Sequence, residues 1–363
     1  MVTTAIFPGR YVQGANALDE CIAEELLRLG KRAFIVQDPT VNKLIGPRID
    51  ALLANKIATQ SEVFCSECCD EEIERISGLT KAFEADVIVG IGGGKTLDTA
   101  KATGAALGLP IVIVPTLAST DAPCSSLVVI YTREGKFKRY LMIPQNPMLV
   151  LVDTQIIANA PARFLVSGMG DALATWFEAE DCRIKGAGNM TTRPGPMTAF
   201  GLARMCFDVL LKYGVLAKAA CEQKMVTPAL EHVVEANTLL SGLGFESGGL
   251  AAAHAIHNGL TVLPETHGYW HGEKVAFGTL AMLMLTDREP ALIDTVYTFC
   301  ESVGLPTTLA QIGLGNVSDA QLLAVATASC QEGETMHNEP YTVTPERILA
   351  ALRAADAYGL HRQ

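Results

Sequence analysis

Short runs of β-branched and aliphatic residues alternate with amphipathic segments along the first 160 positions of the chain. The apolar runs predict buried strands, and the segments between them carry apolar residues at helical spacing. This alternation is typical of a mostly parallel sheet with helices on both faces. Asp70 is the expected N-cap of one helix. We predict strands at Arg32–Gln37, Gln60–Phe64, Val87–Val89 and Ile111–Val114, and helices at Asn42–Ala54, Asp70–Phe83 and Thr96–Leu107.

The pattern changes near Ala160–Pro161. Before this point, two strand-like runs that flank a polar turn predict a hairpin, at Leu127–Tyr131 and Phe137–Met142, and Met148–Asp153 predicts one more strand. After it, strand-like runs nearly vanish. Helical patterns follow at Met169–Arg183, Pro196–Tyr213, Thr227–Leu243, Gly249–Leu260, Val275–Leu285, Pro290–Val303, Asp319–Ser329 and Pro345–Ala357. We therefore predict a Rossmann-like α/β domain over residues 1–160 and an all-helical domain over residues 161–363, with ligands bound between them.

Composition narrows the class of protein. The net charge is 28 − 39 = −11, which disfavours nucleic acid or an anionic membrane as the main partner. A hydrophobic content of 49% with 18% charged residues excludes intrinsic disorder. The longest apolar runs are far shorter than the roughly 20 residues of a membrane-spanning helix, and the opening residues do not resemble a secretion signal. We expect a cytoplasmic protein whose apolar excess fills large cores or the subunit contacts of a homo-oligomer.

The ten cysteines show no disulfide framework. Cys65, Cys68 and Cys69 lie together in the sequence CSECC, but a lone C-x-x-C lacks the second pair of a zinc site. A metal or redox role and a loop of reduced thiols are both open here, and the missing second pair favours the thiols.

A glycine-rich turn follows the predicted strand at Val87–Val89. The segment Gly90–Thr96, GIGGGKT, leads into a helix; glycines let the backbone approach a phosphate, and the helix N-terminus attracts the anion. The turn is not a Walker A loop, because Gly90 and Gly94 are one residue too close. It is not the usual dinucleotide fingerprint either, because Lys95 replaces the third glycine. Phosphate binding is favoured over a purely structural turn.

Two further polar segments fall at the carboxyl edge of the predicted sheet, where open α/β sheets bind ligands. Asp38 follows the first predicted strand, so its carboxylate can accept hydrogen bonds from ribose hydroxyls; a helix N-cap is the equal alternative. The segment Thr116–Asp121 follows the strand at Ile111–Val114 and offers hydroxyls and a carboxylate to a polar ligand, or it is an ordinary βα loop.

Four of the seven histidines lie within one short stretch. His254 and His257 are three residues apart on a predicted helix, and His267 and His271 follow. Each histidine alone is more often structural, but the cluster makes a metal site and a structural role about equally favoured. A catalytic zinc ion typically has three protein ligands and an open position. Asp171, in the sequence GMGDAL, is the candidate carboxylate ligand; the alternative is a partner of the helix dipole.

Five segments together resemble the iron-containing alcohol dehydrogenase superfamily, and within it the glycerol dehydrogenase family. The resemblance covers most of the chain in the right order, although the glycine run and HGEKVAFG recur across the superfamily. The segments are GIGGGKTLDTAK (Gly90–Lys101), PTLASTDAPCSSLVVIY (Pro115–Tyr131), GMGDALATWFEA (Gly168–Ala179), AAAHAIHNGL (Ala251–Leu260) and HGYWHGEKVAFG (His267–Gly278).

The resemblance implies a set of site residues. Asp171, His254 and His271 match the zinc ligands, and Asp121 and His254 match positions that contact the polyol substrate and take part in catalysis. His257 and His267 are not ligands in the family. The positions that match the NAD site are Asp38, Gly92, Gly93, Gly94, Lys95, Thr96, Thr116, Ser119, Ser125, Leu127 and Tyr131.

The implied reaction is NAD-dependent oxidation of glycerol and related vicinal diols at C2, which gives dihydroxyacetone. Iron-dependent members carry Asp-x-x-x-His, whereas here the residue four positions after Asp171 is Thr175. This departure favours zinc and a bidentate diol, although ligand softness alone does not exclude iron or manganese. Glycerol-1-phosphate dehydrogenase and dehydroquinate synthase share the layout but need a basic pocket, for which Lys274, Arg163 and Arg183 are the candidates. A non-catalytic nucleotide-binding or zinc-storage protein is the alternative from another class.

Overall fold

Six parallel strands form the sheet of the N-terminal half in this computed structural model, which describes residues 2–65 and 67–363. The strands lie in the order β1-β8-β5-β4-β2-β3, and every neighbouring pair is parallel. The predicted α/β sheet is confirmed. Its strands are β1 (Tyr11–Gly14), β2 (Arg32–Gln37), β3 (Ala58–Val63), β4 (Val87–Gly92), β5 (Ile111–Pro115) and β8 (Leu149–Asp153).

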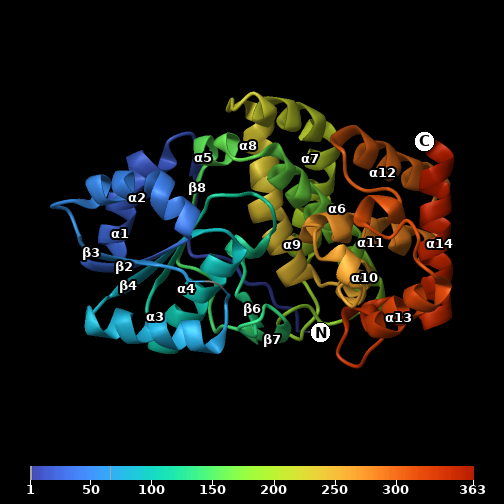
Figure 1. The fold of residues 1–363 in the computed structure, drawn as a ribbon, viewed down its shortest axis with the longest axis horizontal. Coiled ribbons are helices and arrows are strands. Elements are labelled where there is room, and N and C mark those ends of the chain that lie inside the picture. Colours follow the sequence, from blue (N-terminus) through green and yellow to red (C-terminus); the bar gives the residue numbers. More distant parts are fainter. Residues whose placement is uncertain (1, 66) are drawn as a thin grey trace.

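Helices cover both faces of this sheet (Figure 1). In β2, Ala33 and Ile35 pack in the hydrophobic cluster of α1 and α2, whereas Phe34 and Val36 pack in the cluster that contains residues of α3 and α4. All four side chains are fully buried, as expected for a central strand of a parallel sheet. The covering helices are α1 (Ala17–Leu29), α2 (Pro39–Leu53), α3 (Asp70–Ala82) and α4 (Gly94–Leu107).

Two elements of this half, β1 and α1, fall outside the predicted set. The strand β1 is a four-residue edge strand in which every residue is only half-buried, so it lacks a continuous apolar run. The helix α1 buries Leu18, Ile22 and Leu26 at a spacing of four residues. That spacing is a regular helical signal, which the prediction did not use.

The predicted N-cap at Asp70 is wrong by one residue. The helix α3 begins at Asp70 itself, and Cys69 occupies the cap position without a side-chain cap bond. The Asp70 carboxylate instead accepts hydrogen bonds from Arg139 and Lys138, which hold its pKa well below its ordinary value. These bonds tie α3 to the predicted hairpin, which is confirmed as β6 (Leu127–Tyr131) paired antiparallel with β7 (Phe137–Met142).

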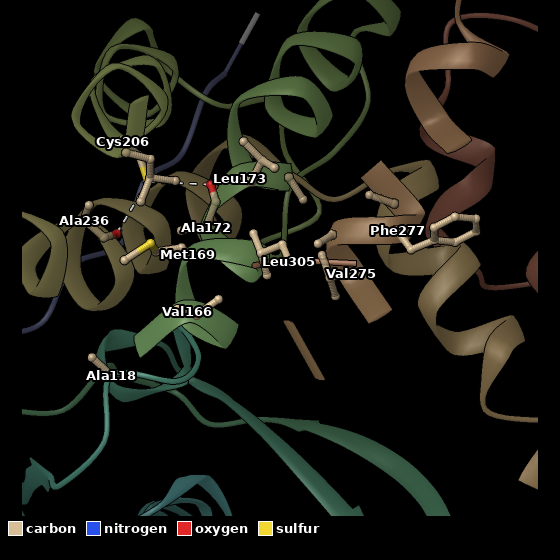
Figure 2. Packing of buried hydrophobic residues seen from close by; sticks show 14 of the residues in the cluster. Ala118, Val166, Met169, Ala172, Leu173, Cys206, Ala236, Val275, Phe277 and Leu305 are labelled. Atoms are coloured by element: carbon tan, nitrogen blue, oxygen red, sulfur yellow. Dashed lines mark hydrogen bonds between the residues drawn. The ribbon is translucent and has the colours of Figure 1, made fainter. Parts of the chain in front are cut away.

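The chain from residue 154 onward is helical throughout its regular elements. The helix α6 lies in the interior of this half. Figure 2 shows three of its own buried side chains, those of Val166, Met169 and Leu173. Beside them, the Cys206 thiol donates to the carbonyl oxygen of Ala172 at 3.7 Å. The α-helices are α5 (Thr154–Asn159), α6 (Ala162–Lys185), α7 (Met197–Glu222), α8 (Pro228–Glu235), α9 (Ser241–Gly248), α10 (Ala252–Leu260), α11 (His271–Leu285), α12 (Pro290–Val303), α13 (Asp319–Ser329) and α14 (Pro345–Arg362).

The helix predicted at Thr227–Leu243 is interrupted by a π-helical turn over Ala236–Leu240, which separates α8 from α9. A π turn inserts an extra residue and rotates the following helix, and such turns are frequent at functional sites. Within it, the Asn237 amide donates to the carbonyl oxygens of Ala118 and Leu165, both at 3.0 Å. The turn therefore fastens the loop after β5 to the start of α6.

The N-terminal residues lie against the helical half. The backbone N–H of Thr4 donates to the Pro194 carbonyl at 3.1 Å, and that of Ile6 donates to the Ser247 hydroxyl at 3.1 Å. The domain boundary at Ala160–Pro161 stays a prediction. Within the described part of the chain, no helix combines the length and the apolar character needed to cross a membrane.

Candidate metal centre and nucleotide site

Asp171, His254 and His271 converge from three different helices, α6, α10 and α11. Their candidate ligand atoms all lie within 4.8 Å of one another. The Oδ1 atom of Asp171 lies 3.0 Å from His271 Nε2 and 3.3 Å from His254 Nε2. The carboxylate is fully buried, whereas the His271 side chain is 36% exposed. The cluster is therefore closed on the Asp171 side and accessible on the His271 side.

Glycines at the crossing of α6 and α11 bring Asp171 and His271 together. A Cβ atom on Gly170 would lie 2.3 Å from the Gly272 carbonyl oxygen, and one on Gly272 would lie 1.7 Å from the Ser167 carbonyl oxygen. No side chain fits at either position. The residues next to these glycines, Asp171 and His271, are consequently held at the closest approach of the two helices.

Glu178, which was not among the predicted site residues, bonds the His254 nitrogen that faces away from the cluster. Its Oε2 atom lies 2.6 Å from His254 Nδ1, and its Oε1 atom accepts the backbone N–H groups of Ala251 and His254, each at 2.9 Å. A carboxylate accepts hydrogen bonds only, so His254 Nδ1 carries a proton, and Nε2 is the nitrogen that would coordinate a metal ion. The seven-residue spacing from Asp171, two helical turns, is the sequence signal that could have identified Glu178.

His257 supports His271 in the same way. Its Nε2 atom lies 3.0 Å from His271 Nδ1, and its Nδ1 atom lies 3.1 Å from the Asn258 side-chain oxygen. His257 therefore contacts the predicted ligand His271 and lies outside the group of three candidate ligands. His267 lies elsewhere and bonds the Thr261 carbonyl through Nε2 at 2.9 Å.

Electrostatics favour a cation among these groups. Burial raises the pKa of Asp171, but His271 and His254 outweigh it and hold that pKa well below its ordinary value. Burial lowers the pKa of His254, but Glu178 and Asp171 together outweigh burial and raise that pKa well above its ordinary value. Two imidazole nitrogens and one carboxylate oxygen form a donor set that suits zinc, with iron and manganese as further possible ions. The residues present therefore fit a divalent metal ion.

Asp121 lies beside this cluster. Its backbone N–H donates to Asp171 Oδ2 at 3.2 Å, and its side chain is buried. Burial and the negative charge of Asp171 raise the pKa of Asp121. One turn before Asp171 on α6, the Ser167 hydroxyl donates to the Ser119 carbonyl at 3.4 Å. The loop after β5 is therefore bonded directly to the helix that carries the predicted metal ligand.

The glycine-rich turn joins β4 to the N-terminus of α4, as expected. Gly92 has φ +155°, and a Cβ atom there would lie 3.0 Å from the Asp38 Cβ. A Cβ atom on Gly94 would meet no atom within 4 Å, so space lies open against the backbone where a pyrophosphate would bind. Thr96 is buried in the first turn of α4, and Gly93 is the N-cap. This cradle fits the phosphates of a dinucleotide.

Two residues of the predicted NAD site have partners within the chain. Asp38 is the N-cap of α2 and accepts the Thr40 and Val41 backbone N–H groups through Oδ1, so the alternative interpretation of Asp38 is present in the structure. Lys95 Nζ lies 2.6 Å from Glu67 Oε1 and 5.0 Å from the centre of the Tyr131 ring.

The remaining predicted NAD-site residues follow β5 and begin β6. Thr116 donates its backbone N–H to the Gly92 carbonyl at 3.1 Å, which joins this segment to the glycine turn. The buried Ser125 hydroxyl donates to the Ala122 carbonyl at 3.1 Å. Lys101 is also buried, and its ammonium group donates to the carbonyls of Ala122, Ser125 and Leu127. These bonds fix the path of the chain between β5 and β6. Lys101 was not among the predicted site residues.

The three cysteines of the CSECC segment differ in their exposure. Cys65 is exposed, whereas Cys68 and Cys69 are buried, and none of the three is in a disulfide. Burial raises the pKa of Cys68 to about 12, so its thiol stays protonated at neutral pH.

Comparisons with known proteins place the chain among dehydrogenases. The family model described as "Iron-containing alcohol dehydrogenase" matches residues 8–154. A glycerol dehydrogenase of Thermotoga maritima is 63% identical, and the match covers 100% of this chain and 99% of that protein. A glycerol dehydrogenase of Escherichia coli O6:H1 is 50% identical over 97% of this chain and 96% of that protein. The crystal structure of a probable glycerol dehydrogenase from Sinorhizobium meliloti superposes with a TM-score of 0.94, 45% identity and coverage of 99% and 100%.

Proposed function

The chain belongs to the iron-containing alcohol dehydrogenase family, and the two relatives that are 63% and 50% identical to it are glycerol dehydrogenases. We propose that it oxidises glycerol and related vicinal diols at C2. The products are dihydroxyacetone and NADH, with release of a proton. The observation that carries this proposal is the convergence of Asp171, His254 and His271 beside Asp121.

The metal centre would polarise the substrate. A zinc ion held by Asp171, His254 and His271 would supply Lewis-acid chemistry that lowers the pKa of a bound alcohol. The chain's own residues fix this site: Glu178 and His257 orient the two imidazoles so that both Nε2 atoms face Asp171. Asp121 would bind a second hydroxyl group of the polyol, which favours diols over simple alcohols.

The nucleotide site would position the hydride acceptor, because NAD carries the redox chemistry in such enzymes. Gly93, Gly94 and the N-terminus of α4 would bind the pyrophosphate, and Asp38 would accept hydrogen bonds from a ribose through the oxygen that does not cap α2. Its negative charge would repel the 2′-phosphate of NADP. Thr116 and Tyr131 would line the nicotinamide half.

The charge balance near the metal centre supports an uncharged substrate. Arg163 forms a bidentate pair with Glu273 at 2.6 and 2.9 Å, so its charge is neutralised within the chain. Lys274 is buried, and burial lowers its pKa. A phosphorylated substrate would need a cation that is not already paired, which Arg163 does not offer.

A diol panel tests the proposal. Purified protein is assayed by NADH absorbance at 340 nm with glycerol, propane-1,2-diol and glycerol-1-phosphate, under NAD and under NADP, and its metal content is measured in parallel. We expect turnover with the diols and NAD, loss of turnover after chelation, and unchanged NAD binding in the chelated protein. Full activity in metal-free protein, or NAD binding without turnover on any diol, would reject the proposal.

We also propose a homo-oligomer in the cytoplasm. Large apolar side chains on α7 are exposed in the single chain: Met197 is 87%, Leu216 60% and Met205 52% exposed. Apolar side chains mark a subunit contact where they form a contiguous exposed patch. Light scattering coupled to gel filtration tests the oligomer, and a mass equal to one chain would contradict it.

A further inference from the structure

A buried hydrogen-bonded chain leads from α6 to the carboxylate of Asp121. Thr175 lies one helical turn after Asp171, and its hydroxyl oxygen is 2.8 Å from that of Ser241, the first residue of α9. The Ser241 hydroxyl donates in turn to Asp121 Oδ2 at 2.8 Å. Thr175 and Ser241 are fully buried. Because Ser241 has a single proton and gives it to Asp121, Thr175 must donate to Ser241.

The behaviour of Thr175 is unusual for a helical threonine in this chain. The buried threonines Thr80, Thr279 and Thr286 donate to the carbonyl oxygen four residues earlier, at 2.7, 2.9 and 2.9 Å. That local bond satisfies the hydroxyl of a threonine on a helix. Thr175 instead bonds a residue 66 positions away, so its hydroxyl serves an arrangement between elements.

The surrounding backbone permits this close arrangement. Ser241 directly follows the π-helical turn, which sets the rotation of α9. A Cβ atom on Gly242 would lie 3.0 Å from the Asp121 carbonyl oxygen, and a Cβ atom on Gly244 would lie 2.5 Å from Thr175 Cγ2. Glycines at these two positions therefore let α9 approach both ends of the chain of hydroxyls.

We infer that Thr175 and Ser241 are positioning residues that fix the Asp121 carboxylate and thereby select polyols over simple alcohols. The inference rests on the proposed function, in which Asp121 binds a substrate hydroxyl. With Oδ2 held by Ser241, Oδ1 is the atom left to accept a hydrogen bond from the polyol. Loss of either hydroxyl frees the carboxylate to rotate and weakens the contact that only a polyol makes.

The variants Ser241→Ala and Thr175→Val test this inference, because each removes a hydroxyl and keeps a buried side chain of similar shape. We expect kcat/KM for glycerol to fall about fivefold to tenfold, mainly through a higher KM, because one hydrogen bond of the chain that orients the Asp121 carboxylate is lost. Turnover of propan-2-ol, which has no second hydroxyl, should stay within about twofold of the wild type. Thr175→Ser keeps the hydroxyl and should restore diol turnover.

Controls separate positioning from general damage. Thr80→Val removes an equally buried helical hydroxyl in α3 and should change neither activity. Zinc affinity should be the same in Ser241→Ala as in the wild type. Parallel losses on glycerol and propan-2-ol, or a Thr175→Ser enzyme as weak as Thr175→Val, would overturn the inference.

A crystal structure of Ser241→Ala gives a readout that does not depend on turnover. The Asp121 carboxylate should adopt a rotated position, and an unmoved carboxylate would overturn the inference. A wild-type enzyme that is inactive on every diol would reject the proposed function; the carboxylate position in the variant would still decide whether the hydroxyls position Asp121.

Discussion

Replacing Glu178 with glutamine should weaken metal binding without unfolding the site. In the wild type, Oε2 lies 2.6 Å from His254 Nδ1, and Oε1 accepts the Ala251 and His254 backbone N–H groups. A glutamine retains one oxygen, which can keep accepting both backbone N–H groups. Its amide nitrogen then faces His254 Nδ1 and cannot accept a proton from it. His254 must turn its ring or move its proton to Nε2, the atom that faces the metal ligands.

The magnitude follows from this change of partner. Loss of a hydrogen bond that orients a metal-bound histidine typically costs about 10-fold to 100-fold in metal affinity. This corresponds to about 1.4–2.7 kcal/mol of binding free energy. The cost should appear in the zinc dissociation constant and in the amount of zinc needed for half-maximal activity, whereas NAD binding should be unchanged because Glu178 lies behind the metal cluster.

Competition against a chromophoric zinc chelator measures the dissociation constant directly. Glu246→Gln is the matched control, because Glu246 is also a buried acid that accepts a backbone N–H, that of Ser126 at 2.6 Å, but it does not touch a predicted ligand. We expect Glu246→Gln to lower the melting temperature and leave zinc affinity unchanged. Equal zinc affinity in Glu178→Gln and the wild type would refute the reasoning.

Three further predictions concern the nucleotide site and the pH dependence of stability. Asp38→Asn should retain the N-cap of α2 and the melting temperature, since Asn caps as well as Asp, while the NAD dissociation constant rises about tenfold; unchanged NAD affinity would confine Asp38 to capping. Gly94→Val should fold normally, because a Cβ there meets no protein atom, yet NAD titration should show binding at least about tenfold weaker; wild-type affinity would place the pyrophosphate elsewhere. Burial and Asp181 raise the pKa of Glu339 to about 9 from 4.5, so the folded chain keeps a proton that the unfolded chain releases. Stability should therefore fall as pH rises from about 5 to 9, and Glu339→Gln should flatten that decline in melting curves. An equal decline with pH in both proteins would contradict the raised pKa of Glu339.

The sequence predicts the parallel sheet for a physical reason, whereas the exact set of metal ligands followed from the family resemblance. Strands such as β4 and β5 are buried on both faces, so they appear as continuous apolar runs bounded by glycine or proline. The predicted metal ligands Asp171, His254 and His271 are chemically distinctive residues in otherwise apolar helices. The structure brings them together, although 100 positions separate the first from the last.

Supporting residues are harder to predict, because their roles depend on contacts between elements. Ser241 reaches Asp121 only because a π turn precedes it, and hydrophobic periodicity carries no signal for an inserted residue. Lys101 would be expected at the surface on its charge alone, yet it is fully buried and bonds three carbonyls. Asp38 shows the opposite case: both interpretations followed from its position, and the capping bonds are present.

Anomalous diffraction at the zinc edge from crystals of the zinc-loaded protein tests the central claim most directly. We predict one strong peak about 2.0–2.2 Å from His254 Nε2, His271 Nε2 and a carboxylate oxygen of Asp171. A zinc peak next to other residues would contradict the account. The absence of any zinc peak in crystals of protein that turns over glycerol would contradict it as well.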